Sequence, residues 1–329
     1  MLSASSDITV KRMKRAISKY MKEHGIGQFS PKAVLFDMDG VLLDSMGNHA
    51  IAWERSMKEC GLHMTKQEAY ATEGQRGVDT IRYMVKQQQG RDITEAEAQK
   101  IYDVKTRVYS ELPEAKHMKG IEEVLMAVKE GGLQIVIVTG SGQKPLIERL
   151  STDFAEYVSK DKIITAYDVE RGKPAPDPYL AGLRKAGNIL PTEAIVVENA
   201  PLGVRAGVAA GIFTVAVNTG PLPDEMLEKE GANVVYPDMR AFFDNLRTIL
   251  PVSCLRDMKW KQHCEEVKRY VSTRNRRPSK YKVDDHRMVN WIKFNRKLYN
   301  QGRMSEERRR IFEQLLSLLD KVKHVNQHA

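Results

Sequence analysis

AVLFDMDGVLLDS, residues 33–45, is the stretch that decides the fold. Its first four residues predict a short apolar strand, which runs directly into the carboxylates of Asp37 and Asp39 and then Gly40. Carboxylates are costly to bury unless a cation or hydrogen bonds compensate them. We therefore expect a positive group between them. Taken alone, the pair also fits a simpler role, in which both aspartates cap the turn that follows the strand.

Three later segments each follow an apolar strand and carry groups suited to a phosphate or a metal ion. They are LQIVIVTGSG with Thr139, ITAYDVERGKPAPDPYL with Lys173, and AIVVENAPLG with Glu198 and Asn199. Together with the first motif they form an ordered set of four. This set resembles the haloacid dehalogenase superfamily of phosphotransferases over roughly residues 30–250.

The two aspartates have distinct expected roles in such chemistry. Asp37 is the expected nucleophile, because a carboxylate can take a phosphoryl group and split one hard transfer into two steps. Asp39 is placed to donate a proton to the leaving oxygen and then to take one from the attacking hydroxyl. Lys173 can offset charge on Asp37 and on the transferring group.

Two carboxylates beside a phosphate call for a hard divalent cation, and Mg²⁺ suits oxygen ligands of this kind. The resemblance implies that its ligands are the Asp37 carboxylate, the Asp39 backbone carbonyl, Glu198 and Asn199. Many family members have an aspartate where this chain has Asn199. The asparagine keeps a carbonyl oxygen, so we expect weaker or water-mediated metal contact there.

Neutral donors for the phosphate oxygens are expected from the segment that begins at Thr139, with the amides of Gly140, Ser141 and Gly142. Alone, Thr139 would fit an ordinary strand-end threonine and Lys173 an ordinary loop lysine. The ordered set of four favours a site.

Strands and helices alternate from Gly120 onward with short connections, which predicts an α/β fold with a doubly wound parallel sheet. Ligands bind at the carboxyl ends of the strands in such sheets, so Asp37, Thr139 and Glu198 should meet there. We assign residues 30–46 and 116–250 to this core. Residues 47–115 have apolar residues at helical spacing and predict an inserted helical cap, which in the resembled family is mobile.

Substrate choice is expected to lie in the cap, where the beta-phosphoglucomutase branch offers a partial match. His49 falls twelve residues after Asp37, which matches a hinge histidine of that branch. TEGQRGVDTI resembles its substrate-contacting loop, yet Glu73 stands where the branch has a lysine, and Arg76 is displaced by one position from its arginine. His49 and Arg76 are therefore candidate substrate-binding residues, with ordinary surface or packing roles as the alternative.

Composition is that of a globular protein, with 42% hydrophobic and 29% charged residues among 329. The three cysteines have no paired spacing, and no stretch approaches the ~20 apolar residues of a membrane span. We expect a cytoplasmic protein without a membrane partner. Residues 1–29 predict an amphipathic helix that packs on the core, with membrane or organelle targeting as the alternative.

The net charge of +9 lies in the C-terminal part of the chain. Residues 251–329 hold 20 Lys and Arg against 9 Asp and Glu, whereas residues 1–250 hold 32 against 34. This asymmetry and the helical patterns predict a separate basic three-helix domain. The spacing of Trp260, Tyr270, Trp291 and Tyr299 resembles the helicase-associated domain of bacteria. Its cations suit either nucleic acid or an acidic protein.

These patterns favour an enzyme: a Mg²⁺-dependent phosphatase that acts on a small phosphorylated metabolite, such as a sugar phosphate, through phospho-Asp37. One alternative is a beta-phosphoglucomutase. Another is a nucleic-acid-binding or regulatory protein that uses the basic C-terminal domain.

Overall fold

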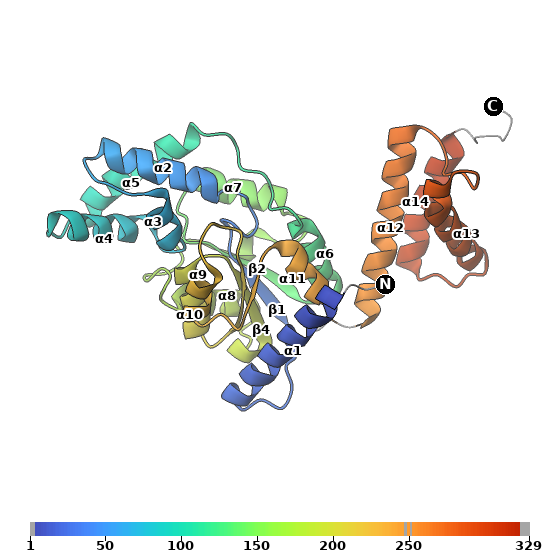
Figure 1. Cartoon of the computed structure of the whole chain (residues 1–329), viewed down its shortest axis with the longest axis horizontal. Helices are drawn as coiled ribbons and strands as arrows, with labels where there is room; N and C mark the ends of the chain where they lie inside the picture. The colour runs from blue at the N-terminus through green and yellow to red at the C-terminus, as the bar shows by residue number, and fades with distance from the viewer. Residues whose placement is uncertain (1–3, 247–248, 251, 323–329) are drawn as a thin grey trace. The chain divides into compact units, whose positions relative to one another are not determined.

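The computed structural model describes residues 4–246, 249–250 and 252–322. The chain divides into two compact units, Met1–Pro251 and Val252–Ala329 (Figure 1). The first unit contains the sheet and the inserted helices, and the second is helical throughout its regular elements. Each unit has its own hydrophobic core. We therefore describe them one at a time.

A six-stranded parallel sheet forms the centre of the first unit, with strand order β3-β2-β1-β4-β5-β6. The strands are β1 (Ala33–Phe36), β2 (Gln134–Val138), β3 (Ile163–Ile164), β4 (Ala194–Glu198), β5 (Phe213–Val217) and β6 (Val234–Tyr236). Nearly every strand residue is buried, as expected for a parallel sheet with both faces covered. The predicted doubly wound α/β fold is confirmed.

Helices cover both faces of the sheet. They are α6 (Ile121–Glu130), α7 (Lys144–Asp153), α8 (Asp177–Lys185), α9 (Pro201–Ala209), α10 (Asp224–Lys229) and α11 (Met239–Asn245). Helices α8 and α9 pack on each other and on β2 and β5, whereas α6 packs on β2 and α11. Helix α1 (Ala4–His24) packs on α11 and β6, with Met13 and Tyr20 buried. Its packing on the core agrees with the first of the two sequence interpretations.

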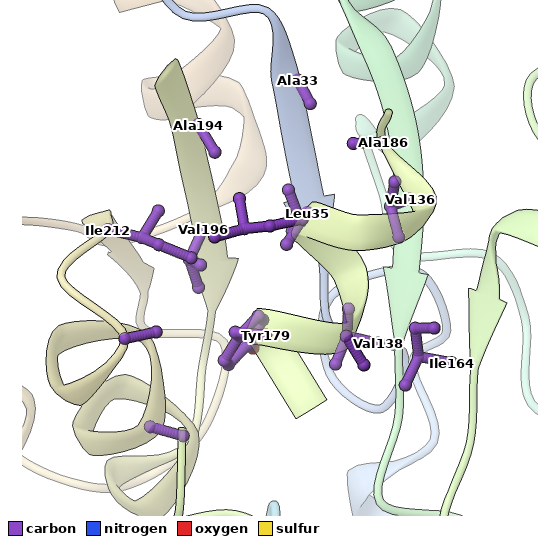
Figure 2. Packing of buried hydrophobic residues seen from close by; sticks show 14 residues of the cluster. Ala33, Leu35, Val136, Val138, Ile164, Tyr179, Ala186, Ala194, Val196 and Ile212 are labelled. Atoms are coloured by element: carbon purple, nitrogen blue, oxygen red, sulfur yellow. The ribbon is translucent and has the colours of Figure 1, made fainter. Parts of the chain in front are cut away.

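One face of the sheet packs against α8 and α9 through a cluster of aliphatic side chains (Figure 2). The register pairs Leu35 with Val136 on one side and Val196 on the other, so the three point to the same face. Gly182 of α8 lies directly over Leu35, because a methyl group on Gly182 would come within 2.7 Å of the leucine side chain. The close approach of α8 holds the loop that precedes it near the end of β1.

The register also aligns the carboxyl ends of the three central strands. Phe36, the last residue of β1, pairs with Ile137 of β2 and Val197 of β4. The residues that follow therefore meet at one edge of the sheet. Asp37, Thr139 and Glu198 occupy this edge, as the alternation of strands and helices predicts.

Four helices between β1 and α6 form the cap, a helical layer with its own core. They are α2 (Met46–Glu59), α3 (Lys66–Ala71), α4 (Gly77–Gln89) and α5 (Glu95–Ser110). Trp53, Met57 and Ile81 are buried within this layer. Thr65 and Thr94 begin α3 and α5 with capping boxes, which satisfy amide groups of the first helical turn. The two connections to the core run side by side, since Leu43 pairs with His117.

The second unit is a small bundle of α12 (Val252–Arg274), α13 (His286–Asn300) and α14 (Glu306–Lys321). Trp260 is buried, as its spacing predicts, and its indole N–H donates to Oδ1 of Asn295. Trp291 is only partly buried against the same core. Asp285 is buried beside α13, where it accepts hydrogen bonds from Tyr270, Arg276 and the Ser279 amide. Within the described part of the chain, no helix is sufficiently long and apolar to cross a membrane.

Candidate active site

Lys173 joins two acidic side chains at the carboxyl edge of the sheet. Its Nζ donates to Oδ1 of Asp37 at 2.6 Å, to Oε1 of Glu198 at 2.7 Å and to the Val138 carbonyl at 3.0 Å. The Lys173 and Glu198 side chains are fully buried, and that of Asp37 is 6% exposed. The lysine thus compensates two carboxylates that burial would otherwise make costly.

The charges of this group shift one another's protonation equilibria. Burial favours the neutral amine of Lys173, but the carboxylates of Asp37 and Glu198 outweigh it and raise its pKa above the usual range. Burial raises the pKa of Asp37 well above its usual value, and the nearby Glu198 carboxylate adds to this effect, whereas Lys173 opposes it. A cation beside Asp37 would favour its ionised form.

Glu198 has all of its hydrogen-bonding capacity engaged inside the core. Besides Lys173, Oε1 accepts from the Tyr179 hydroxyl at 2.7 Å. Oε2 accepts from the amides of Asn199 at 2.9 Å and Ala200 at 3.2 Å. Gly203 leaves the space for this carboxylate, because any side chain at that position would collide with it. Glu198 therefore holds Lys173 in place.

Asn199 differs from its neighbour, because its Oδ1 is buried and has no hydrogen-bond partner. Its amide nitrogen lies over Gly40, where a β-carbon would collide with it, and Gly40 also has a φ of +80° that disfavours other residues. The backbone of the Asp37–Gly40 turn and the Asn199 side chain are thus packed together. An unpartnered carbonyl oxygen on a side chain that packs against this turn is a suitable oxygen ligand for a hard cation.

Asp39 belongs to a second chain of contacts that runs into the cap. Its Oδ1 accepts from the Ser45 hydroxyl at 2.5 Å and lies 2.9 Å from Nε2 of His49. On the other side of the imidazole, Lys105 of α5 donates to Nδ1 at 2.7 Å. Burial raises the pKa of Asp39, but His49 and Ser45 outweigh it and lower the pKa below the usual value.

Lys105 is buried at 2% exposure among aromatic rings of the cap. Its Nζ lies 5.2 Å from the ring centroid of Trp53 and 5.1 Å from that of Tyr109. Burial lowers its pKa to about 8, although Glu73 and Asp39 favour the charged form. This lysine therefore titrates close to physiological pH, which surface lysines do not.

The segment after β2 forms a neutral wall opposite the aspartates. Thr139 is buried, and its Oγ1 accepts a hydrogen bond from the Ser141 amide at 2.9 Å. Gly140 permits close approach of the cap, since a β-carbon there would lie 2.7 Å from the Gly74 carbonyl. Gln143 is 5% exposed, and its Nε2 has no hydrogen-bond partner.

A pocket lies between these loops and the cap. Core residues in its lining are Asp37, Asp39, Thr139, Gly140, Ser141 and Gln143, and cap residues are His49, Trp53, Thr72, Glu73, Gly74, Gln75, Gly77, Thr80, Tyr102 and Lys105. Its volume is about 30 Å³, which is room for only a few water molecules. This space is smaller than a sugar phosphate.

Of the predicted site residues, only Arg76 lies apart from this pocket and from the groups beneath it. Its guanidinium bonds to both oxygens of Asp79, at 2.7 and 3.1 Å. Arg76 lines a neighbouring pocket together with Glu95 and Asp103. Asp79 three residues later on the same helix was a signal in the sequence for this pairing.

The fold brings several further residues to the site that the sequence patterns do not indicate. They are Ser45, Tyr102, Lys105, Gln143 and Tyr179. Ser45 lies within the first motif, so its proximity to Asp39 could have been proposed. The others occupy helices or a helix start, where spacing alone does not separate a site residue from a packing one.

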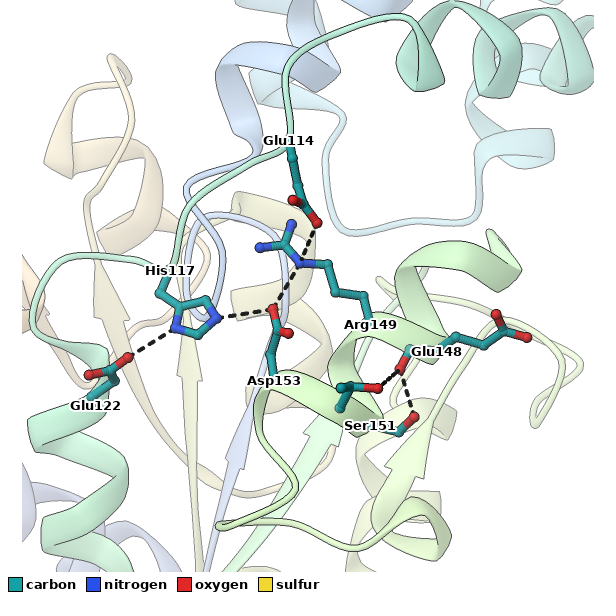
Figure 3. Close-up of polar contacts among 8 residues, drawn as sticks. Glu114, His117, Glu122, Glu148, Arg149, Ser151 and Asp153 are labelled. Carbon is teal, nitrogen blue, oxygen red and sulfur yellow. Dashed lines mark hydrogen bonds and ion pairs between the residues drawn. The ribbon is translucent and has the colours of Figure 1, made fainter.

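The linker that returns from the cap to the core carries its own polar cluster (Figure 3). His117 lies between two carboxylates, with Nδ1 3.0 Å from Glu122 and Nε2 3.1 Å from Asp153. Arg149 pairs with Asp153 and also with Glu114 of the linker. The hydrogen bond to Glu122 raises the pKa of His117, and Asp153 adds to this effect despite partial burial.

Comparison with known proteins adds independent information about this fold and site. The family model of haloacid dehalogenase-like hydrolases matches residues 34–217. Hexitol phosphatase A of Escherichia coli is 33% identical over 187 residues, which are 57% of this chain and 83% of that protein. Validoxylamine A 7'-phosphate phosphatase of Streptomyces hygroscopicus subsp. limoneus is 31% identical over 191 residues, 57% of this chain and 86% of that protein.

A solved structure from Bacteroides vulgatus, described as a presumptive beta-phosphoglucomutase, is also similar. It is 47% identical in sequence, with a TM-score of 0.69, and the match covers 73% of this chain and 97% of that one. The family match ends before the second unit begins. The resemblance of residues 251–329 to a helicase-associated domain therefore stays a prediction.

Proposed function

The chain belongs to the haloacid dehalogenase-like hydrolase family, and from this premise we propose that it is a phosphatase of small phosphorylated metabolites, sugar phosphates first among them. The observation that carries the proposal is the buried contact of 2.6 Å between Lys173 and Asp37 at the carboxyl edge of β1. Two of the similar proteins are named phosphatases. A cytoplasmic location stays a prediction.

The reaction divides into two steps. Oδ of Asp37 attacks phosphorus, the bond from phosphorus to the ester oxygen breaks, and Asp39 gives a proton to the departing alkoxide. Asp39 must enter this step protonated, although its contacts with His49 and Ser45 favour the ionised form that the second step requires. Asp39 then takes a proton from water, whose oxygen attacks the phospho-aspartate, and inorganic phosphate and free Asp37 result. Lys173 offsets negative charge on Asp37 throughout.

The donor set fits a magnesium ion. Of the four ligands expected from the sequence, Asp37, the unpartnered Oδ1 of Asn199 and the Asp39 backbone carbonyl would hold it. Glu198 would act on the site through Lys173 instead, because both of its oxygens already accept hydrogen bonds inside the core. When bound, the ion supplies positive charge that draws the phosphate and the carboxylate together. Within the described residues no three His, Cys, Asp or Glu side chains form a metal cluster. Mg²⁺ is compatible with this, because it commonly binds through only one or two carboxylates, with water and phosphate as further ligands.

His49, Ser45 and Lys105 support the role of Asp39. Lys105 donates to Nδ1 of His49, which leaves Nε2–H to face Asp39. Asp39 is thereby held in one orientation, with Ser45 as a second donor. All of these side chains are buried, so bulk water does not compete for them.

Phosphate release from a panel of sugar phosphates and nucleotides tests this proposal. With Mg²⁺ present, we expect turnover by the wild type and none by Asp37→Asn. Asp92→Asn is the matched control, because Asp92 is an exposed aspartate of the cap. Release of phosphate by Asp37→Asn at the wild-type rate would exclude an aspartyl-phosphate on this residue.

The mutase alternative draws support from the similarity to the Bacteroides vulgatus structure. A mutase would convert beta-glucose 1-phosphate into glucose 6-phosphate without net release of phosphate. Following both products separates the two activities directly. Dominant isomerisation would replace phosphatase with mutase as the function.

A second candidate function concerns the C-terminal unit, for which we propose binding to a nucleic-acid backbone. Helix α13 contains four Lys or Arg residues and no acidic residue. Lys293, Arg296 and Lys297 are exposed and make no ion pair within the part of the chain described. Phe294, between them, is 62% exposed. Unpaired cations beside an exposed ring suit phosphate contacts and base stacking.

Fluorescence anisotropy of labelled single-stranded DNA with the full chain tests this second function. We expect binding that weakens as salt rises, and a loss on Lys293→Gln/Arg296→Gln/Lys297→Gln. Arg303→Gln/Arg309→Gln/Arg310→Gln removes the same charge from exposed positions outside α13 and should retain most binding. No binding at low salt would end this proposal, and an acidic protein would then be the partner to test.

A further inference from the structure

The cap contributes a wall to the active-site pocket that is polar yet nearly free of positive charge. Its polar groups are Thr72, Glu73, Gln75, Thr80, Tyr102 and Lys105, with His49 at the hinge side. Thr80 accepts a hydrogen bond from Gln75 at 3.0 Å. The part of a substrate that does not react must face these groups, because the core loops surround the phosphoryl group itself. The chemistry of this wall therefore helps to determine which phosphate esters can bind.

The two cations near this wall, Lys105 and Arg76, are already engaged in contacts with other protein groups. Lys105 is 2% exposed, donates to His49 and lies among the rings of Trp53 and Tyr109. The Arg76 guanidinium makes a two-point contact with Asp79 and lines the neighbouring pocket instead. Around the active-site pocket, as far as the chain is described, no uncommitted cation is available for a second phosphate.

Glu73 provides an acidic group at this wall. Burial raises its pKa, and Asp39 adds to this effect, although His49 and Lys105 favour the ionised form. Whether ionised or neutral, the carboxyl group offers hydrogen bonds to hydroxyl groups and no positive charge. Its position is defined by the next residue, because Gly74 packs against both Gly140 and Gly203 of the core.

An amide donor from the core lines the same pocket. Nε2 of Gln143 is buried and makes no hydrogen bond within 3.5 Å, and a polar neighbour of this side chain is the Tyr102 hydroxyl, whose pKa it lowers against the larger effect of burial. An amide donor and a carboxyl acceptor in one pocket match the two hydrogen-bonding faces of a substrate that carries several hydroxyl groups.

We propose that Glu73 selects phosphate monoesters whose remaining part is a neutral polyol or sugar, and that it rejects substrates with a second phosphate. The proposal rests on the phosphatase function above and names its substrate class. Hydroxyl groups donate to Glu73 and accept from Gln143. A second phosphate would instead face a carboxyl group with no free cation near it, which disfavours binding through an unpaired buried charge.

The test compares kcat/KM for glucitol 6-phosphate and glucose 1,6-bisphosphate in four proteins: wild type, Glu73→Gln, Glu73→Lys and Glu54→Lys. Wild type should prefer the monoester by about 100-fold or more. Glu73→Gln should lose about 10-fold in kcat/KM on the monoester, because one carboxyl oxygen is replaced by an NH2 group that cannot accept a hydrogen bond from a substrate hydroxyl group. Glu73→Lys should improve use of the bisphosphate at least about 10-fold relative to the monoester.

Glu54→Lys makes the same change of charge at an exposed position of α2 and should leave the preference unchanged. The ratio between two substrates is informative here, because a general folding defect lowers both values together. If Glu73→Lys does not fold, the near-isosteric Glu73→Gln variant decides the question alone. Equal use of both substrates by the wild type, or an unchanged ratio in Glu73→Gln, would refute selection by Glu73.

Acetyl phosphate distinguishes failure of this proposal from failure of the phosphatase function. It is too small to need the cap wall, and its hydrolysis by the wild type reports on the core chemistry alone. Hydrolysis without any preference between the two sugar esters would refute only the role of Glu73. No hydrolysis of any phosphate compound with Mg²⁺ would refute both.

Discussion

Nζ of Lys173 lies 2.6 Å from Oδ1 of Asp37, although 136 residues separate them in the chain. The contact is buried, and Glu198 binds the same ammonium group at 2.7 Å. Three segments of the sheet edge are therefore tied together by one cation. The residues of the reactive group thus also make contacts that stabilise the core.

Replacement of this cation should affect stability as well as activity. Lys173→Met leaves Asp37 and Glu198 buried without their partner, which typically costs about 3–5 kcal/mol when a buried pair is broken. We expect that loss in the free energy of unfolding of the first unit, with no detectable phosphate release. Lys160→Met is the control, because Lys160 is exposed. If the Lys173→Met protein were as stable as the wild type, the contacts of Lys173 with Asp37 and Glu198 would not be maintained in solution.

Lys105 should set the alkaline limit of activity. Its lowered pKa of about 8 means that the ammonium form, which donates to His49, predominates below pH 8 and is lost above it. Turnover should fall as pH rises through this value. Lys105→Met should lower turnover at pH 7 by about 10-fold, part of the contribution of general acid–base catalysis, and should abolish the alkaline decline.

Lys100→Met, at an exposed position of the same helix, should keep the wild-type pH profile. The measurement is kcat against pH from 6 to 10 with a single substrate. An alkaline decline that persists unchanged in Lys105→Met would assign that decline to another group.

His117 should make stability depend on pH with a definite sign. Its pKa is raised in the folded state by Glu122 and Asp153, so its stabilisation is complete below the unfolded pKa of about 6.5 and is lost as pH rises through the folded value. In calorimetry, His117→Gln should lower the unfolding temperature of the first unit most at pH 5.5. The difference from wild type should shrink towards pH 9.

His63→Gln serves as the comparison, because His63 is an exposed histidine of the cap. It controls for the loss of a histidine side chain at a surface position of the same unit. A His117→Gln difference that does not change with pH would mean that the linker cluster of Figure 3 adds no titrating contact.

Asp285 should be a major determinant of the stability of the second unit. It accepts hydrogen bonds from Tyr270, Arg276 and the Ser279 amide, and Asp285→Asn places an amide donor among these donors. Because hydrogen bonds to charged groups contribute about 1.5–3 kcal/mol, we expect a loss of about 2 kcal/mol in that unit. Asp284→Asn, at the exposed neighbouring position, should cost less than about 0.5 kcal/mol.

Much of the fold follows from local patterns in the sequence. Alternating strands and helices predicted a parallel sheet, and this topology alone predicted that Asp37, Thr139 and Glu198 share an edge. The packing of α1 on the core followed from its amphipathic pattern, which Met13 and Tyr20 illustrate. These features depend on periodicity and chain direction, which can be recognised without coordinates.

The cap's contribution to the site could not be predicted in the same way. Lys105 is one lysine in an amphipathic helix, where exposure is the usual outcome, and its burial depends on His49 and on rings from two helices. In the sequence Glu73 is only a departure from a related pattern, and its position at the pocket wall is set by the fold. The contact of Arg76, by contrast, could be predicted from the sequence, because its partner Asp79 lies three residues further along the chain.

The reactive residues lie on the core and the proposed substrate-selecting residues lie on the cap. This separation affects how the substrate preference of such enzymes can change. The reactive group is built on strand ends, whereas Glu73 and its neighbours lie on an inserted segment with its own hydrophobic core. Substitutions in the inserted cap can therefore change which phosphate ester is accepted, while the residues at the strand ends stay the same. Those near residues 72–80 would do so without disturbing the strand ends that carry Asp37 and Glu198.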